Sequence, residues 1–293
     1  MSTQYYVLTH TDLDGTGCEI VARLLYDNPV VIRSEADQAR VDEAVQGLLA
    51  RRREGSGGYI IIADVCPREE TLAALDDEGG VFIYDHHATA AGRCYQYPWA
   101  MIDQTRCGCK IMFEEESKRL ERRIDPEVQK FIDAVDAYDR WQLGTSARLA
   151  GENLNFLHRF IWHDRMVRRG AQLELDDRER WLVECFKENI ARTAEKVIKV
   201  CKEGVDEDGH RFVAVIADVF TSDVSEAIAQ AYPEAEYVLV INPMDGAASI
   251  RVRNGQKLDV SKIAKKRGGG GHPEAAGYPS PIDVIQIIGA KPV

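Results

Sequence analysis

The sequence lacks a hydrophobic run long enough to cross a membrane: no stretch approaches the ~18 consecutive apolar residues that a spanning helix needs. Residues 1–4 lead directly into a predicted strand, without the basic segment that opens a secretory signal. We therefore expect a cytoplasmic protein with no membrane partner. With 293 residues, of which 45% are apolar and 29% charged, the chain can bury one large core or fold as two domains.

Positive charge is also scarce. The 37 Lys and Arg residues are outnumbered by 48 Asp and Glu residues, which gives a net charge of −11. This balance argues against a broad basic surface that coats long single-stranded or duplex nucleic acid. A phosphate-bearing substrate would have to be bound locally, and the C-terminal part supplies a basic cluster opposed only by Asp259. The cluster consists of Arg251, Arg253, Lys257, Lys262, Lys265, Lys266 and Arg267.

Cysteine is present, but its spacing does not indicate a disulfide framework or a zinc-binding motif. The seven cysteines are an odd number and form no CxxC pair, which favours reduced thiols over disulfides or a zinc ribbon. The closest pair, Cys107 and Cys109, is expected to be buried as small residues of a helix.

Three apolar runs in the first 90 residues end in acidic residues or histidines. Tyr5–Leu8 is followed by His10, Asp12 and Asp14, Tyr59–Ala63 by Asp64, and Val81–Tyr84 by Asp85, His86 and His87. Side chains at i, i+2 and i+4 of an extended segment project to one side. In open α/β sheets, ligands bind at the carboxyl ends of the strands. The pattern therefore predicts one divalent-metal site assembled from three strands.

The donor types suggest the ions and the chemistry. Carboxylate oxygens suit Mg²⁺ and Mn²⁺, and the added imidazoles favour Mn²⁺. The set is larger than one ion requires, whereas two ions about 3.5–4 Å apart, bridged by a carboxylate and a hydroxide, would use it to hydrolyse a phosphate ester. Each motif alone is as readily a solvated turn or a helix cap. Their coincidence at three strand ends is what indicates a metal site.

The first part of the chain alternates strands with helices, which is typical of a parallel sheet covered by helices on both faces. The expected strands are 5–9, 59–63 and 81–84, and the expected helices are 15–26, 38–53, 69–77, 105–121 and 126–137. A long helical pattern over 176–203, ended by Gly204, indicates a connector, although a surface helix of the first domain fits the periodicity equally well.

A smaller α/β domain is expected after this helix. Its strands are expected at 211–217, 236–241 and 247–253, and its helices at 223–231 and 260–266. The predicted organisation is a catalytic domain over 1–175, a connector helix over 176–205 and a substrate-binding domain over 206–293.

A glycine-rich segment, Gly268–Gly277, follows the basic helix. Glycines allow backbone N–H groups to approach a phosphate closely, and His272 can donate to the same oxygens. Such a loop alone is more often a turn. Its position after the strand that carries Arg251 and Arg253 strengthens the phosphate interpretation, because arginine makes bidentate contacts with phosphate.

Together these motifs resemble those of the DHH phosphoesterases with their associated C-terminal domain, and the resemblance spans the chain. It implies that His10, Asp12 and Asp64 hold one Mn²⁺, with Mg²⁺ as the alternative ion. It also implies that Asp14, Asp64 and His86 hold the second, so that Asp64 bridges the two ions. In this comparison Asp85 orients a histidine, and His87 lies beside the attacking water or the leaving phosphate.

The resemblance implies two further groups of site residues. A fourth family motif contributes another aspartate to the second metal; of Asp133, Asp136 and Asp139 we favour Asp136, with Asp139 as the alternative. The substrate phosphate would be bound by the arginine of the serine–arginine strand and by the glycine-rich signature. These residues are Arg251, Arg253, Gly269, Gly270, Gly271 and His272.

The resemblance is greatest to the oligoribonuclease (nanoRNase) branch. It implies an exonuclease that degrades short oligonucleotides, RNA or DNA, to nucleoside monophosphates. Three alternatives remain open: a phosphodiesterase or phosphatase for a small nucleotide, such as a cyclic mono- or dinucleotide or 3′-phosphoadenosine 5′-phosphate; a pyrophosphatase; and a non-catalytic nucleotide-binding module. The sequence leaves the oligomeric state open and admits a homodimer.

Overall fold

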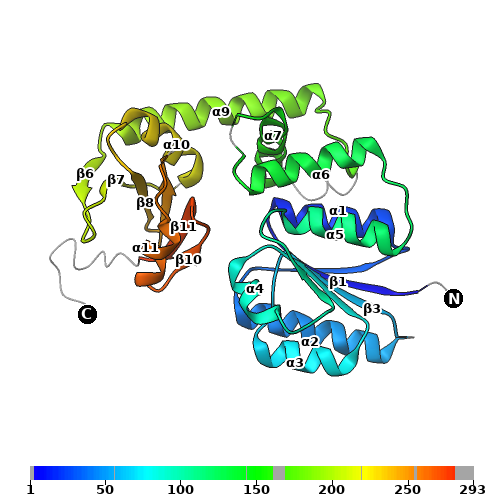
Figure 1. Cartoon of the computed structure of the whole chain (residues 1–293). Coiled ribbons are helices and arrows are strands. Elements are labelled where there is room, and N and C mark those ends of the chain that lie inside the picture. Colours follow the sequence, from blue (N-terminus) through cyan, green and yellow to red (C-terminus); the bar gives the residue numbers. More distant parts are fainter. Residues whose placement is uncertain are drawn as a thin grey trace, which may run out of the picture. The chain divides into compact units, whose positions relative to one another are not determined.

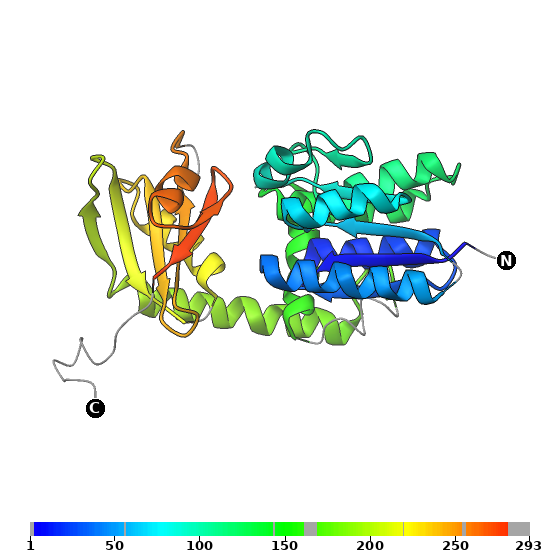
Figure 2. The same cartoon turned by 90° about the horizontal axis from the view of Figure 1, so that it is seen from below.

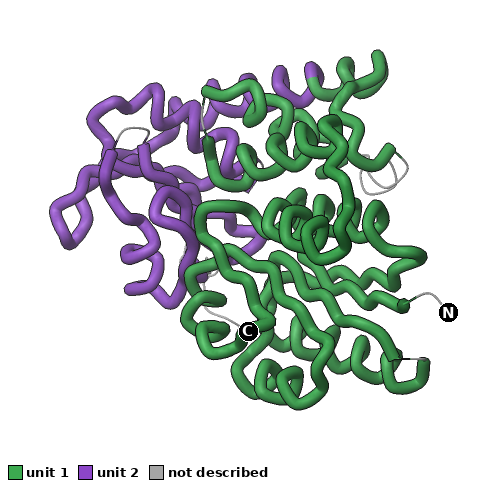
Figure 3. The backbone as a smooth tube through the Cα atoms, turned by 45° about the vertical axis from the view of Figure 1, so that its right-hand side comes forward, with its two compact units in different colours: residues 1–183 green, residues 184–293 purple. Residues whose placement is uncertain are grey.

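The computed structural model describes residues 3–55, 57–142, 144–160, 169–218, 220–253 and 256–280. The chain divides into two compact units, residues 1–183 and 184–293 (Figure 3). The division falls within the long helix α9 (Asp177–Ile198). Each unit contains its own β-sheet. In the described part of the chain, no helix is both long and apolar enough to span a membrane.

The first unit is built on a five-stranded parallel sheet with the order β2-β1-β3-β4-β5. Its strands are β1 (Tyr5–His10), β2 (Val30–Ser34), β3 (Tyr59–Ala63), β4 (Val81–Asp85) and β5 (Ala100–Ile102). The inner strands are almost continuously apolar, and Val7, Ile61 and Ile83 are completely buried. Such strands need cover on both faces, as the sequence predicts.

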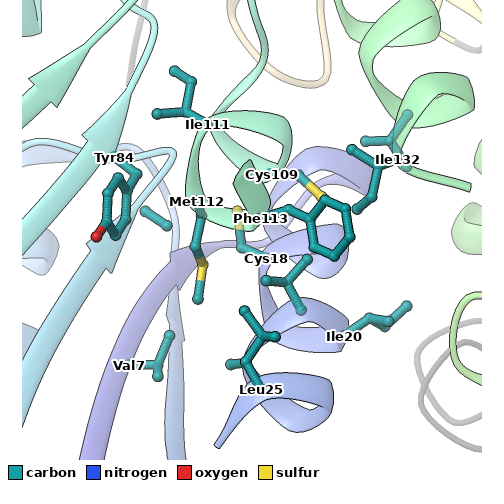
Figure 4. Close-up of a cluster of buried hydrophobic side chains, with 14 of the residues drawn as sticks. Val7, Cys18, Ile20, Leu25, Tyr84, Cys109, Ile111, Met112, Phe113 and Ile132 are labelled. Atoms are coloured by element: carbon teal, nitrogen blue, oxygen red, sulfur yellow. The ribbon is translucent and has the colours of Figure 1, made fainter. Parts of the chain in front are cut away.

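Helices provide that cover on both faces (Figures 1 and 2). One face carries α1 (Leu13–Leu25) and α5 (Gly108–Arg119); α6 (Pro126–Asp139) packs on these two helices, and α7 (Ser146–Phe160) packs on α6. The opposite face carries α2 (Gln38–Glu54), α3 (Glu69–Glu78) and α4 (Ala88–Cys94). In Figure 4, Val7 and Tyr84 of the sheet meet Leu25 of α1 and Met112 of α5 in the first core.

The sequence predicts β1, β3 and β4 and their intervening helices, and the α/β fold class is confirmed. It misses β2 and β5, the two edge strands, and also α4 and α7. β2 is half-buried along most of its length and β5 has three residues, so neither presents a long apolar run. All seven cysteines are free thiols, as expected, and Cys107 and Cys109 are buried.

The second unit contains a mixed sheet with the order β10-β11-β9-β8-β7-β6. Its strands are β6 (Lys202–Val205), β7 (Arg211–Ile216), β8 (Tyr237–Asn242), β9 (Ala247–Val252), β10 (Gly270–Gly271) and β11 (Ala275–Pro279). β7 and β8 are parallel and the other pairs antiparallel. The helices are α10 (Thr221–Ala231) and α11 (Val260–Lys266).

One boundary predicted from the sequence is wrong. The helix expected to continue to residue 203 ends at Ile198, and Gly204 lies in strand β6. Gly204 is paired with Phe212 of β7, and a Cβ at this glycine would lie 2.7 Å from the Phe212 ring. This glycine therefore makes room for strand pairing, and it does not end a helix.

Candidate metal centre

The residues expected to bind metal meet at the carboxyl edge of the first sheet. The strand order places β2 on one side of β1 and β3 on the other, so the chain reverses its winding direction between β1 and β3. Ligand sites of open α/β sheets form outside such a switch point. His10 ends β1, Asp64 follows β3, and Asp85 ends β4. The topology therefore brings the three sequence motifs together.

The loop after β1 orients two of the candidate ligands. Asp12 caps α1 by accepting a hydrogen bond from the Gly15 backbone N–H through Oδ1, at 2.9 Å. Its other oxygen, Oδ2, lies 2.9 Å from Nδ1 of His10. A Cβ on Gly15 would lie 2.3 Å from the carbonyl oxygen of His10. Only glycine allows the first turn of α1 to pass this close to the end of β1.

Asp64 lies at the centre of the cluster, with its two oxygens directed at different partners. Oδ2 is 3.7 Å from Nδ1 of His10, and Oδ1 is 3.4 Å from Nε2 of His86. The residue is 3% exposed and has a φ of +61°, an uncommon conformation for a residue with a side chain. Oδ2 has no hydrogen-bond partner among the described residues. This geometry suits a carboxylate that bridges two cations.

Among the described residues, the donor atoms of the candidate ligands lie within 4.8 Å of one another in three overlapping sets: His10, Asp12 and Asp64; Asp14, His86 and Asp139; and Asp64, Asp85, His86 and His87. In the second set, Nε2 of His86 is 3.8 Å from Asp14 Oδ2 and 3.6 Å from Asp139 Oδ2. Oδ2 of Asp139, like Oδ2 of Asp64, is buried without a hydrogen-bond partner in the described part of the chain. A buried carboxylate without a partner must either take up a proton or be compensated by a cation, and this set of carboxylates and imidazoles fits divalent metal ions.

Asp136, the residue favoured from sequence, does not join the second set. Its Oδ1 accepts a hydrogen bond from the Cys107 backbone N–H at 2.8 Å, and its Oδ2 accepts from the Gln142 side chain at 3.2 Å. Helix α6 continues one turn past Asp136 and ends at Asp139. The structure therefore favours Asp139, the alternative, because it places this residue beside His86.

The N-terminus of α5 anchors the second set. The carboxylate of Asp14 accepts hydrogen bonds from the backbone N–H groups of Gly108, at 2.7 Å, and Cys109, at 2.8 Å. A Cβ on Gly108 would lie 2.9 Å from Cβ of Asp64 and 3.1 Å from Asp14 Oδ2. Gly108 thus contacts two candidate ligands, a role that the sequence does not reveal, because its neighbours Cys107 and Cys109 are expected only to be buried residues of a helix.

Asp85 orients His87, as the family resemblance implies. Oδ1 of Asp85 lies 2.7 Å from Nδ1 of His87 and also accepts the backbone N–H groups of His86 and His87. Burial disfavours the charged imidazolium, but the hydrogen bond and the charge of Asp85 outweigh it and raise the pKa of His87 to about 9. His87 can therefore carry a proton at neutral pH.

The carboxylates repel one another strongly. Burial, followed by the charges of Asp14 and Asp12, raises the pKa of the Asp64 carboxyl well above its usual range. Burial and the charge of Asp14 do the same to the pKa of Asp139. Divalent cations would stabilise the ionised form of both carboxyls, because they compensate the negative charge without requiring a proton.

The second unit presents part of the expected phosphate site. A cavity of about 340 Å³ is lined by residues of β9, β10 and β11, including Arg251, Gly270 and Gly271. Nη2 of Arg251 donates to Oγ of Ser222, near the start of α10, at 2.8 Å. A Cβ on Gly270 would meet no atom within 4 Å. The backbone of Gly270 is therefore accessible to a ligand on that side.

The other predicted phosphate ligands do not line this cavity. A Cβ on Gly269 would lie 2.0 Å from the carbonyl oxygen of Gly277, so this glycine is required by strand packing. Arg253 lies beyond the end of β9, and its backbone N–H donates to Glu236. His272 exchanges backbone hydrogen bonds with Ala275 in the turn between β10 and β11. In the basic cluster, Lys266 forms an ion pair with Asp208.

Comparison with known proteins gives matches of low identity, one over nearly the whole chain and one over about half of it. No protein-family model matches the chain. The chain is 24% identical over 306 residues to the oligoribonuclease NrnB of Bacillus subtilis, covering 98% of this chain and 75% of the relative. A 3′,5′-cyclic-nucleotide phosphodiesterase of Helicobacter pylori is 23% identical over 184 residues, covering 55% of this chain and 52% of the relative.

Two solved structures share the fold. The pGpG-specific phosphodiesterase PggH from Vibrio cholerae has a TM-score of 0.53 at 16% identity, covering 97% of this chain and 96% of that structure. RecJ from Thermus thermophilus in complex with Mn²⁺ has a TM-score of 0.59 at 14% identity, covering 95% of this chain and 50% of that structure.

The assignment of the fourth aspartate can be tested with two matched variants. We expect Asp139→Asn to weaken binding of one divalent cation by at least about tenfold, since it removes a charged ligand. Asp136→Asn should keep cation affinity and lower thermal stability, because the Cys107 N–H loses a charged acceptor. Titration calorimetry with Mn²⁺ measures the cation affinity of each variant, and thermal unfolding measures its stability. Weaker cation binding in Asp136→Asn alone would contradict the assignment.

The close approach of α5 can be tested with Gly108→Ala. The added methyl group would lie about 3 Å from both Asp64 and Asp14, so we expect weaker cation binding in a protein that still folds. Gly92→Ala in α4 is the matched control, because a Cβ there meets no atom within 4 Å. Equal cation affinities of the two variants would show that the contact with Gly108 does not shape the site.

The repulsion among the carboxylates predicts a pH dependence. Because the pKa of Asp64 is raised in the folded protein, its contribution to stability falls as pH rises above the ordinary carboxyl pKa of about 4. In EDTA, Asp64→Asn should therefore melt at a higher temperature than the wild type at pH 8, by a margin that shrinks toward pH 5. In excess Mn²⁺, the wild type should instead melt at a higher temperature than Asp64→Asn. A less stable variant at pH 8 in EDTA would refute this account.

Proposed function

We propose that this chain, which belongs to the DHH phosphoesterases, is a Mn²⁺-dependent phosphodiesterase that degrades short oligonucleotides to nucleoside monophosphates. The observation that carries the proposal is the carboxylate of Asp64, whose two oxygens face His10 and His86 in two separate sets of candidate ligands. Two cations bound there would activate a water molecule and stabilise the charge that develops on the phosphate. The imidazoles of both sets favour Mn²⁺ over Mg²⁺.

The side chains around the candidate metal centre have separable tasks. The carboxylates would hold the cations, and the N-terminus of α5 fixes Asp14. His87, with Nδ1 bonded to Asp85, would present Nε2 to the oxygen of the leaving group and deliver a proton to it. Its raised pKa, about 9, keeps that proton available at neutral pH.

The second unit would bind a phosphate of the substrate. Arg251 supplies a guanidinium that suits bidentate contact, and the open face of Gly270 supplies a backbone that a phosphate can approach. A local site of this kind agrees with the net charge of −11, which disfavours long polyanions. Similarity to an oligoribonuclease and to a pGpG-specific phosphodiesterase supports a short oligonucleotide as the substrate.

A cyclic nucleotide is the second candidate substrate. Similarity to a 3′,5′-cyclic-nucleotide phosphodiesterase over 55% of this chain favours it. Both candidates contain a phosphodiester, so the metal chemistry would be the same. They differ in whether nucleotide units extend beyond the scissile bond.

The function is tested by incubating a 5′-labelled RNA pentamer with the protein and Mn²⁺, in parallel with a 3′,5′-cyclic nucleotide and pyrophosphate. We expect stepwise shortening of the pentamer to monophosphates, with a loss of at least about a thousandfold in kcat for Asp64→Ala, because the bridging ligand is removed. If the pentamer stays intact while the cyclic nucleotide is hydrolysed, the cyclic nucleotide is the substrate class. No turnover of any of these substrates would refute the enzymatic proposal.

A further inference from the structure

Another cavity, with charged residues in its lining, lies beside the candidate metal centre within the first unit. It has a volume of about 340 Å³ and is lined by Thr11, Arg33, Ser34, Glu35, Arg40, Glu43 and Ala44. Thr11 stands between the candidate ligands His10 and Asp12, and Ser34 at the end of β2 is the register partner of His10. Since paired strands are about 4.8 Å apart, the cavity begins one strand away from the first set of ligands.

Arg33 ties this cavity to the metal-binding loop. Its Nη2 donates to the carbonyl oxygen of Thr11 at 2.7 Å and to Oγ1 of Thr16 at 2.9 Å. The guanidinium is half-buried and is therefore held in one orientation. A ligand in the cavity would meet a preorganised cation next to the loop that carries His10 and Asp12.

The remaining charges of the cavity are exposed and of both signs. Arg40 lies in the first turn of α2, and neither its side chain nor that of Glu43 forms a hydrogen bond or ion pair with the described residues. A lining with two guanidiniums and two carboxylates does not select a bare anion. It suits a ligand that combines a phosphate with hydroxyl and amino donors, which is the chemistry of a nucleotide.

From these observations we infer that the cavity at the end of β2 binds the nucleotide unit adjacent to the scissile phosphate. Arg40 contacts the phosphate of that unit, Arg33 lies against its sugar or base, and the carboxylates accept hydrogen bonds from its donors. The volume is within the range of about 300–1,000 Å³ of ligand pockets. This inference rests on the proposed phosphodiesterase function and adds the place where substrate length is recognised.

The test compares a substrate that has such a unit with one that lacks it. The RNA pentamer extends past the scissile bond, whereas bis(p-nitrophenyl) phosphate is a diester without a nucleoside. Arg40→Gln removes the exposed cation, and Arg51→Gln on the same helix is the control for net charge. We expect Arg40→Gln to lower kcat/KM for the pentamer about tenfold, as for loss of one charge-assisted contact, and to leave the small diester unchanged.

A second variant fills the cavity. Ala44→Phe places a ring where the nucleotide would bind, and Ala39→Phe is the matched control on an exposed position of α2 outside the cavity. A selective loss with the pentamer supports the inference. If Arg40→Gln and Ala44→Phe hydrolyse the pentamer like their controls, or if they slow both substrates equally, the inference is overturned. Wild-type protein that hydrolyses neither substrate would instead refute the proposed function itself.

Discussion

The hydrogen bonds between the N-terminus of α5 and the carboxylate of Asp14 are the interaction on which the candidate metal centre depends. Several carboxylates are buried together at one sheet edge, and each opposes the ionisation of the others. Two backbone N–H groups and the positive end of a helix dipole offset part of that repulsion before any cation binds. The same contact joins the site to α5, whose residues Ile111 and Met112 belong to the first core.

This coupling explains why small residues surround the site. Gly15 lets α1 start against the backbone of His10, and Gly108 lets α5 reach Asp64. Asp64 itself holds a positive φ, which costs free energy that the surrounding packing must supply. A shift of α5 would therefore move Asp14 and disturb the contact between Gly108 and Asp64.

The sequence predicts most of the fold and of the candidate site, because strand ends are marked by an abrupt change from apolar residues to ligand-type residues. His10, Asp64 and His86 can be located in this way. Asp139 cannot be distinguished from Asp136 by sequence, since the choice depends on where α6 ends and on which carboxylate the N-terminus of α5 engages. The roles of Gly108 and Arg33 cannot be predicted from the sequence for a similar reason, because their contacts join segments that are far apart in the chain.

The charge distribution sets a condition on any polyanionic substrate. Asp64, Asp139 and their neighbours generate a negative field at the sheet edge, and a phosphodiester approaching the metal-free site would be repelled. Bound cations would invert the field locally, and screening by salt would limit its range to about 8–10 Å. Phosphates farther along a chain would need protein cations of their own. Arg33 and Arg40 supply two beside the site, whereas the chain as a whole carries no excess of positive charge, with a net charge of −11. Under the proposed function, substrate length is therefore limited by the supply of cationic side chains.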